Sequence, residues 1–125
     1  MNGLTLDAGA LIAVDRGEAR MTALLHRVVE RGVPLAVPAG VVAQAWRGGP
    51  RQARLARLLT APETDIVPID GATARAIGVI CGHTGVDDVV DVSVVLCARE
   101  RADTIVTADR GDLRRIDPKA RLIAL

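Results

Sequence analysis

Short apolar runs alternate with longer segments of mixed polarity along the whole chain. The runs are rich in Leu, Val and Ile, which is typical of buried strands. They lie at 4–6, 33–40, 64–70, 103–109 and 120–125. The segments between them carry apolar residues at helical spacing, and some open with Pro or close with Gly, as helices do. They lie at 8–18, 18–32, 39–49, 50–62, 71–83, 87–102 and, as a short helix or turn, 110–117.

The alternation of strands and helices predicts the fold class. It favours an α/β, three-layer sandwich in which helices cover a central, mostly parallel five-stranded sheet through right-handed crossovers. The run at 120–125 is expected at an edge of this sheet. A length of 125 residues without repeats or linkers predicts a single domain, 1–125. Because Trp46 is the only aromatic residue, the core must consist of Ala, Val, Leu and Ile, which suits buried parallel strands.

Charge and cysteine content narrow the function classes only slightly. The 16 basic and 15 acidic side chains give a net charge of +1. The net charge therefore does not indicate a binding partner, and only the distribution of charges along the chain can do so. All basic residues except Lys119 are Arg; this bias is compatible with phosphate binding, or else reflects a GC-rich genome. Cys81 and Cys97 form no CxxC motif and are expected to be free thiols of a cytosolic protein. A signal peptide is not expected, because the first residues lack a basic region and carry Asp7 within their apolar stretch. Membrane association is not expected either, because no apolar run is long enough to span a bilayer.

Aspartates gather where predicted strands end and where one helix begins. Asp7 follows the first strand, Asp109 follows the fourth, and Asp112 comes three residues later. In an open α/β sheet, ligands bind beyond the carboxyl ends of the strands. Asp88 and Asp91 are three residues apart at the start of a helical segment, so they share a helix face. If that helix begins at the same edge, the carboxylates converge, and Mg²⁺, or Mn²⁺ in its place, relieves their repulsion.

Some of these acids have structural explanations as well. Asp87 is expected to cap or start the helix, and Asp88 either caps it or takes part in the site. Asp109 and Asp112 either cap a turn or belong to the site.

Asp7 and Asp91 are harder to explain structurally, because apolar residues flank both of them. An unpartnered buried carboxylate is costly, so a metal is the best candidate for their partner. His26 and His83 are isolated in the sequence and are not expected to be metal ligands.

The sequence resembles the PIN-domain family, in particular the VapC-type toxins of bacterial toxin–antitoxin pairs. The resemblance rests on "LTLDAGALIA", "VPAGVVAQAWRGG", "DDVVDVSVVLCA" and "DTIVTADRGDL", which together extend over nearly the whole chain. It implies a magnesium-dependent endoribonuclease with a five-stranded parallel sheet and an acidic site at the carboxyl edge. It also implies a toxin of the bacterial cytoplasm that acts on RNA and is neutralised by a small antitoxin. A homodimer is expected too.

The resemblance further implies roles for the acids. Asp7 matches the first metal-binding acid, and Asp91 matches the acid that opens the penultimate long helix. Asp88 is a further acid one turn earlier, and Asp109 and Asp112 match the last acidic positions. Asp7 and Asp91 would be the principal ligands of one or two Mg²⁺ ions, and the others would complete the shell or hold waters. The expected catalytic set is Asp7, Asp91, Asp109 and Asp112, and the expected metal ligands are Asp7, Asp91, Asp88 and Asp109.

Two positions depart from the family's pattern. Gln44 stands where the family usually has a Glu, and a neutral amide coordinates through its oxygen without supplying charge. Gly9 stands where the family often has a small polar residue. We hypothesise that Asp88 partly replaces the missing carboxylate. The alternative function is an attenuated, non-catalytic PIN module that binds RNA or an antitoxin.

Four arginines form the densest basic stretch and are the expected RNA- or antitoxin-binding residues. They are Arg47, Arg51, Arg54 and Arg57. Phosphate contacts there would give binding that weakens with salt. The resemblance implies that an antitoxin docks on these helices, and a solvated helix face is the remaining explanation. Trp46 alone cannot form a stacking platform for bases and is expected in the core or an interface.

Other hydrolytic or Mg²⁺-binding classes fit less well. A receiver domain needs paired acids after the first strand and a well-placed Lys after the last. A haloacid-dehalogenase-like phosphatase needs DxD where this chain has DAG. Ser93 is the only serine and lies within a predicted helix without a nucleophile-elbow motif. No P-loop motif occurs.

Overall fold

The strands and helices follow one another in the predicted order. The structure is a computed structural model that describes residues 2–125. The strands are β1 (Leu4–Leu6), β2 (Leu35–Pro38), β3 (Thr64–Val67), β4 (Thr104–Thr107) and β5 (Leu122–Ala124). The α-helices are α1 (Ala8–Asp15), α2 (Ala19–Glu30), α3 (Ala39–Ala45), α4 (Ala53–Thr60), α5 (Gly71–Thr84), α6 (Val89–Arg101) and α7 (Arg110–Ile116). A 3₁₀ turn, η1 (Pro50–Gln52), precedes α4.

All five strands run parallel, in the order β3-β2-β1-β4-β5. The predicted α/β class and five-stranded sheet are therefore confirmed, and the sheet is wholly rather than mostly parallel. β5 lies at one edge, as predicted, and β3 lies at the other. In the central strand β1, Leu4 pairs with Leu35 on one side and with Thr104 on the other. Every residue of β1 and β2 is buried, which explains their nearly continuous apolar sequence.

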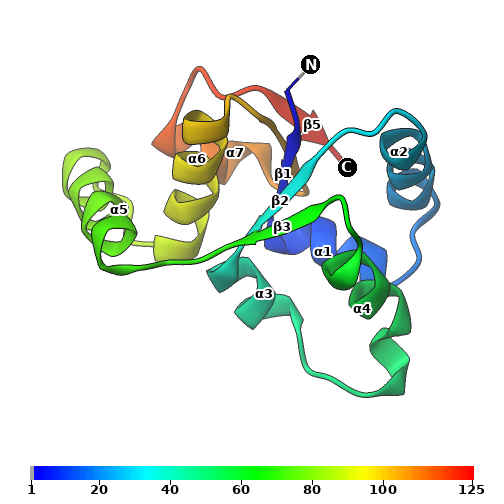
Figure 1. The fold of residues 1–125 in the computed structure, drawn as a ribbon. Helices are drawn as coiled ribbons and strands as arrows, with labels where there is room; N and C mark the ends of the chain where they lie inside the picture. Colours follow the sequence, from blue (N-terminus) through cyan, green and yellow to red (C-terminus); the bar gives the residue numbers. More distant parts are fainter. Residues whose placement is uncertain (1) are drawn as a thin grey trace.

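Two layers of helices cover the sheet and complete the three-layer sandwich. α5, α6 and α7 lie on one side, and α1, α2 and α4 lie on the other, in the left and right parts of Figure 1. α6 packs on β1, β2 and β4, and its Val92, Val94 and Val95 are at most 1% exposed. α5 packs on α6 and α7 and forms an outer helix. Within residues 2–125, none of these helices combines the length and apolar character needed to cross a membrane.

A buried glutamine explains why the third helix is shorter than predicted. α3 ends at Ala45, and the chain then turns through Gly48 and Gly49, whose φ angles of 82° and 90° favour glycine. Gln52 Oε1 accepts from the N–H groups of Arg47 at 2.7 Å and Gly48 at 2.9 Å. Its Nε2 donates to the Ala45 carbonyl at 2.9 Å. One side chain thus satisfies backbone groups that a longer helix would have paired.

Both cysteines are free thiols, as the sequence predicted. Cys97 is buried in α6, whereas Cys81 in α5 is half-buried. Burial raises the pKa of the Cys97 thiol, and a hydrogen bond with the Thr5 side chain opposes this effect. The Cys97 thiol therefore stays protonated and unreactive at neutral pH.

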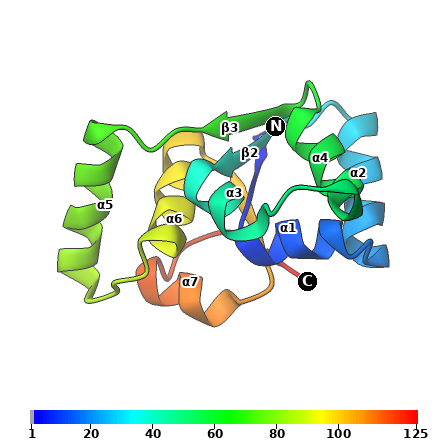
Figure 2. The ribbon, with the colours of Figure 1, turned by 90° about the horizontal axis from the view of Figure 1, so that it is seen from below.

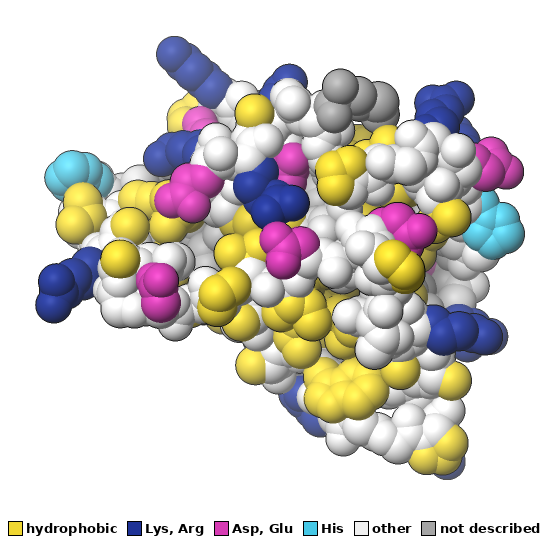
Figure 3. All heavy atoms as spheres, viewed as in Figure 1, with side chains coloured by type: hydrophobic (Ala, Val, Ile, Leu, Met, Phe, Trp, Pro, Cys, Tyr) yellow, Lys and Arg dark blue, Asp and Glu magenta, His cyan; other side chains and the backbone are white. Residues whose placement is uncertain are grey.

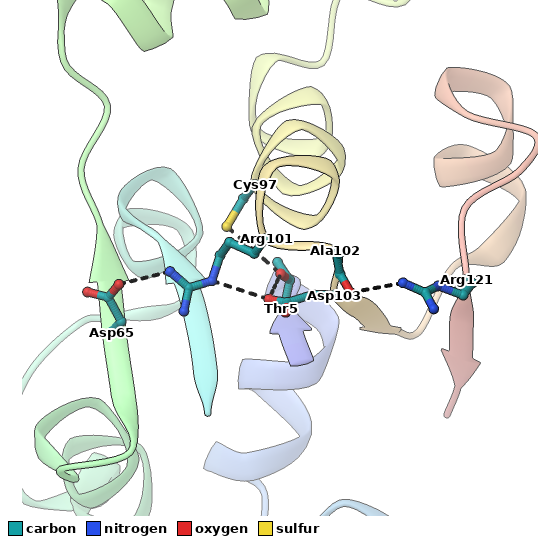
Figure 4. Close-up of polar contacts among 7 residues, drawn as sticks. All are labelled: Thr5, Asp65, Cys97, Arg101, Ala102, Asp103 and Arg121. Carbon is teal, nitrogen blue, oxygen red and sulfur yellow. Dashed lines mark hydrogen bonds and ion pairs between the residues drawn. The ribbon is translucent and has the colours of Figure 1, made fainter. Parts of the chain in front are cut away.

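A charged cluster ties α6 to the amino ends of three strands (Figure 4). Arg101, the last residue of α6, donates through Nη1 to Asp65 Oδ2 of β3 at 3.0 Å. Its Nε lies 3.3 Å from Asp103 Oδ2, just before β4. The Asp103 carboxylate also accepts from the Thr5 hydroxyl of β1 at 2.9 Å. Because a buried carboxylate is tolerated only when paired and hydrogen-bonded, these contacts fix the amino ends of β1, β3 and β4 relative to α6.

Removing the buried partner of Arg101 should destabilise the fold more than removing the exposed one. We expect Asp103→Ala to lower the free energy of unfolding by about 2–3 kcal/mol, because the buried Thr5 hydroxyl loses its acceptor. Asp65→Ala should cost less than about 1 kcal/mol, since exposed ion pairs contribute little and the Asp65 side chain is 62% exposed. Urea unfolding followed by circular dichroism measures both. Equal losses in the two variants would contradict this role of Asp103.

Candidate active site

The strand order reverses at the centre of the sheet, between β1 and β4. β2 and β3 extend the sheet on one side of β1, and β4 and β5 extend it on the other. Such a reversal opens a crevice at the carboxyl ends of the two central strands, where α/β sheets bind their ligands. Asp7 directly follows β1, and its N–H donates to the Val106 carbonyl of β4 at 3.2 Å. Asp7 thus lies at this crevice and is only 7% exposed.

Three aspartates at this edge cap helices that begin there, whereas α3, which directly follows β2, begins without a side-chain cap. In each case Oδ1 accepts from the backbone N–H three residues later, at 2.8 Å for Asp7, 3.1 Å for Asp88 and 3.2 Å for Asp109. Their helices are α1, α6 and α7, which lie around this edge when the molecule is seen from below (Figure 2). Capping occupies one oxygen of each carboxylate and leaves the other for a further partner.

Asp91 shows that the carboxylates at this edge repel one another. Its pKa is raised from 3.8 to about 6, first by burial and then by the charges of three other aspartates. Those neighbours are Asp88, Asp112 and Asp7. We define the acidic cluster as Asp7, Asp88, Asp91, Asp109 and Asp112.

Asp7 is held in the acidic cluster by a threonine that the sequence did not single out. Burial raises the pKa of Asp7, a hydrogen bond with the Thr107 side chain lowers it, and the charge of Asp109 raises it. Thr107 is the fully buried last residue of β4, and its hydroxyl accepts from the Asp109 N–H at 2.9 Å. It therefore connects two acids of the cluster. Thr107 could have been identified from the sequence as a polar residue at the end of an apolar strand, close to a predicted site acid.

An acidic pocket of about 170 Å³ opens beside Asp91. It is lined by Gly85, Val86, Asp87, Asp88, Asp91, Asp112 and Arg115. Of the two roles expected for Asp87, the cap is wrong, because the Asp88 carboxylate accepts the N–H bonds of the first turn, but Asp87 does lie at the start of α6. Asp87 also adds a fourth carboxylate to the pocket wall.

The donors of the acidic cluster fit a hard cation. All of them are carboxylate oxygens, which Mg²⁺ and Mn²⁺ prefer, and neither His nor Cys lines the acidic pocket. Within residues 2–125, no three His, Cys, Asp or Glu side chains are grouped closely enough to hold an ion directly. Mg²⁺ commonly keeps several waters and binds through one or two carboxylates. The spacing of the donors is therefore compatible with a hydrated ion.

Asp7 and Asp109 belong to the acidic cluster without lining the acidic pocket, and three other predicted site residues lie outside both. Gln44 is exposed on α3 and does not line the pocket. The Arg47 guanidinium donates to two carbonyls at the end of α3, at 3.2 and 2.7 Å. Arg51 is exposed in the 3₁₀ turn η1. The structure therefore does not join these residues to the acids.

Arg54 and Arg57 line a separate groove of about 390 Å³, which we name the α2–α4 groove. The other lining residues are Val14, Thr22, Leu25, His26, Val29, Leu35, Leu58, Ala61 and Glu63. Most of these are apolar, and the groove shares no lining residue with the acidic pocket. Half of the predicted arginine set thus belongs to a second surface of the molecule.

Gly9 lies where α1 passes very close to the end of β4. A Cβ atom at this position would lie 2.6 Å from the Ala108 Cβ and 3.4 Å from Asp7 Oδ1. A real Cβ would therefore force the start of α1 away from the residue that follows Thr107. The missing side chain at Gly9 keeps Asp7 within reach of Thr107.

Comparison with known proteins gives one family and several solved structures with a similar fold, two of which are described here. The family described as "PIN domain" matches residues 4–119. A solved structure described as "Structure of FitAB bound to IR36 DNA fragment" has a TM-score of 0.64 at 16% identity, covering 97% of this chain and 94% of its own. A second, "Crystal Structure of FitAcB from Neisseria gonorrhoeae", has a TM-score of 0.62 at 19% identity and covers 96% of each chain. At these identities the likeness shows a shared fold. No curated protein matches the sequence.

The raised pKa of Asp91 predicts how stability depends on pH in the ion-free protein. Its folded-state pKa of about 6 exceeds the ordinary value of 3.8. The folded protein therefore binds extra protons between about pH 4 and 6 and loses stability as the pH rises through that range. Asp91→Asn cannot ionise, so at about pH 7.5 in chelator it should be about 1–2 kcal/mol more stable than the wild type, after allowance for solvent screening.

Urea unfolding at several pH values measures this difference, which should nearly vanish at about pH 4. Asp65→Asn changes a carboxylate outside the acidic cluster and should show no comparable gain at high pH. An Asp91→Asn protein that is no more stable than the wild type at high pH would contradict the coupling.

Proposed function

The chain belongs to the PIN-domain family, and from this premise we propose that it is a metal-dependent endoribonuclease toxin. It would hydrolyse RNA phosphodiesters at the acidic cluster and be neutralised by a cognate antitoxin. The observation that carries this proposal is the coupling of carboxylates at the crevice, where Asp91 has a pKa raised to about 6. Such perturbed groups in a crevice are typical of functional sites. We assign the catalytic set to Asp7, Asp91, Asp109 and Asp112.

We propose Asp7 and Asp91 as the principal ligands of Mg²⁺, with Mn²⁺ as a substitute, and Asp88 and Asp109 as further acids that complete the shell or hold its waters. When bound, the ion would supply an activated water and stabilise the leaving oxygen. The chain's own residues supply the positioning. Thr107 and the first turn of α1 hold the Asp7 carboxylate. The positive ends of α1 and α6 face the same crevice and favour the negative charge of a phosphate.

A second candidate function is an attenuated, non-catalytic PIN module that binds RNA or an antitoxin. The observation that favours it is Gln44, a neutral amide that is exposed on α3 and does not line the acidic pocket. Without a carboxylate at this position the acidic cluster attracts a cation less strongly. Binding to a partner does not depend on that charge.

We propose that the antitoxin docks in the α2–α4 groove. Its apolar lining suits the apolar face of a partner segment, and Arg54 and Arg57 suit acidic residues on that segment. Arg47 and Arg51 lie outside the groove and are candidates for contacts with the RNA backbone. Both partners would be met in the bacterial cytoplasm, where free thiols such as Cys97 stay reduced.

We also propose that the chain forms a homodimer. Trp46, Ile66 and Ile69 are 38 to 40% exposed, and apolar side chains that form a contiguous exposed patch mark an interaction site. Hydrophobic side chains gather over α3 and the segment that follows β3, in the lower middle of Figure 3. A second copy of the chain would cover this face.

Neutralising either principal ligand should abolish cleavage without unfolding the protein. We expect Asp7→Asn and Asp91→Asn to leave labelled RNA intact in Mg²⁺ or Mn²⁺, because each removes a carboxylate that holds the ion. Chelator should have the same effect on the wild type. Asp65→Asn removes an acid outside the acidic cluster and should remain active. Circular dichroism checks that each variant is folded.

The outcomes of this experiment separate the two candidate functions. A fully active Asp7→Asn protein would show that the assigned ligands are wrong. A wild type that binds RNA but cleaves it with neither ion would favour the non-catalytic module.

Asp88 allows charge to be separated from helix capping. Asn caps helices as well as Asp does, so Asp88→Asn keeps the start of α6 and removes one charge beside Asp91. We expect weaker Mg²⁺ binding in calorimetry and slower RNA cleavage, because Asp88 would supply charge that Gln44 lacks. Asp87→Asn removes the same charge from the preceding residue and should change both measurements less. If Asp88→Asn alters neither, Asp88 does not replace the missing carboxylate.

A further inference from the structure

The acidic pocket presents an electrostatic problem for the RNA that it is proposed to bind. Four lining side chains are carboxylates, namely Asp87, Asp88, Asp91 and Asp112. RNA carries a negative charge at every phosphate, so these carboxylates repel it. A cation bound at the acidic cluster offsets the charge of the reacting phosphate, but the neighbouring phosphates still face the rim of the pocket. A basic side chain at that rim would lower the repulsion.

Arg115 is the one basic residue among those that line the acidic pocket. It lies on α7, which Leu113 and Ile116 anchor in the core with 1% and 4% exposure. The Arg115 side chain itself is 70% exposed. Its Nη1 is 3.7 Å from Asp112 Oδ1, too far for a hydrogen bond. Since an exposed ion pair of this kind adds little stability, the guanidinium is free to turn toward a phosphate.

The other candidate arginines are placed differently. Arg54 and Arg57 line the α2–α4 groove. Arg47 donates to carbonyls at the end of α3. On α7 itself, Arg114 donates to the Pro118 carbonyl at 3.0 Å and does not line the acidic pocket. Arg114 and Arg115 are therefore adjacent and equally charged, but Arg114 contacts the Pro118 carbonyl whereas Arg115 lines the acidic pocket.

We propose that Arg115 binds an RNA phosphate beside the scissile one, at the rim of the acidic pocket. The inference rests on the proposed function for the identity of this ligand. A guanidinium donates two parallel N–H bonds to one phosphate. The contact therefore fixes the orientation of the phosphate and also offsets its charge. Without RNA, the attraction of Asp112 keeps Arg115 beside the pocket. Arg115 thus holds the substrate over the acidic cluster and leaves bond cleavage to other residues.

Kinetics and equilibrium binding of Arg115 variants test this proposal. In steady-state cleavage of a labelled single-stranded RNA, Arg115→Ala should raise KM about tenfold and change kcat less than about twofold, because it removes one charge-assisted contact. Arg115→Lys keeps the charge and should recover part of the loss. Arg114→Ala is the matched control and should leave KM unchanged.

Binding is measured separately in the Asp7→Asn background, where cleavage is not expected. There Arg115→Ala should weaken RNA binding and reduce the slope of log K against log salt by about 0.7, the change expected for one phosphate contact. Arg114→Ala should leave that slope unchanged.

Several results would overturn the inference. They are an unchanged KM and salt slope in Arg115→Ala, equal losses in the Arg114 and Arg115 variants, and a fall in kcat at constant KM. Failure of the proposed function looks different, since the wild type would then not cleave RNA with either ion while RNA binding still depended on Arg115. If RNA bound neither the wild type nor any variant, both proposals would be wrong.

Discussion

Three of the helices that begin at the carboxyl edge of the sheet, α1, α6 and α7, are each capped by an aspartate whose carboxylate accepts backbone N–H bonds. This capping requirement determines where negative charge gathers in the molecule. Each cap satisfies N–H groups that the helix itself cannot pair and contributes about 1 kcal/mol. The parallel sheet brings the starts of α1, α6 and α7 to the same edge, so local stabilisation of the helices creates repulsion among their caps. Burial raises the pKa of Asp91 most, and the nearby charges of Asp88, Asp112 and Asp7, two of which are caps, raise it further.

The buried carboxylates at the two edges of the sheet differ in whether a cation within the fold neutralises them. At the amino edge, Asp103 is paired with Arg101 and hydrogen-bonded by Thr5, so its charge is neutralised within the fold. At the carboxyl edge, Asp7 is equally buried and receives only hydrogen bonds, while Asp109 repels it. The first arrangement contributes to stability. The second leaves a deficit of positive charge that a ligand can relieve, which is the usual difference between a structural and a functional site.

The sequence predicted those features that depend on local pattern. Apolar periodicity located every strand and helix, and the rule on strand ends placed Asp7 and Asp109 at one edge. Features that depend on distant contacts could not be predicted. The early end of α3 depends on Gln52, a later residue that pairs the backbone of the intervening loop. Likewise, Arg115 meets the carboxylates of α6 only because α6 and α7 are packed side by side.

The neutral residue Gln44 takes no part in the repulsion among the acids. It is exposed on α3 and does not line the acidic pocket, and its amide carries no charge. Asp88 adds a charge close to Asp91 while its capping bonds stabilise α6. A charge placed on a helix cap thus offsets part of its own repulsion, which one on the exposed face of α3 could not do.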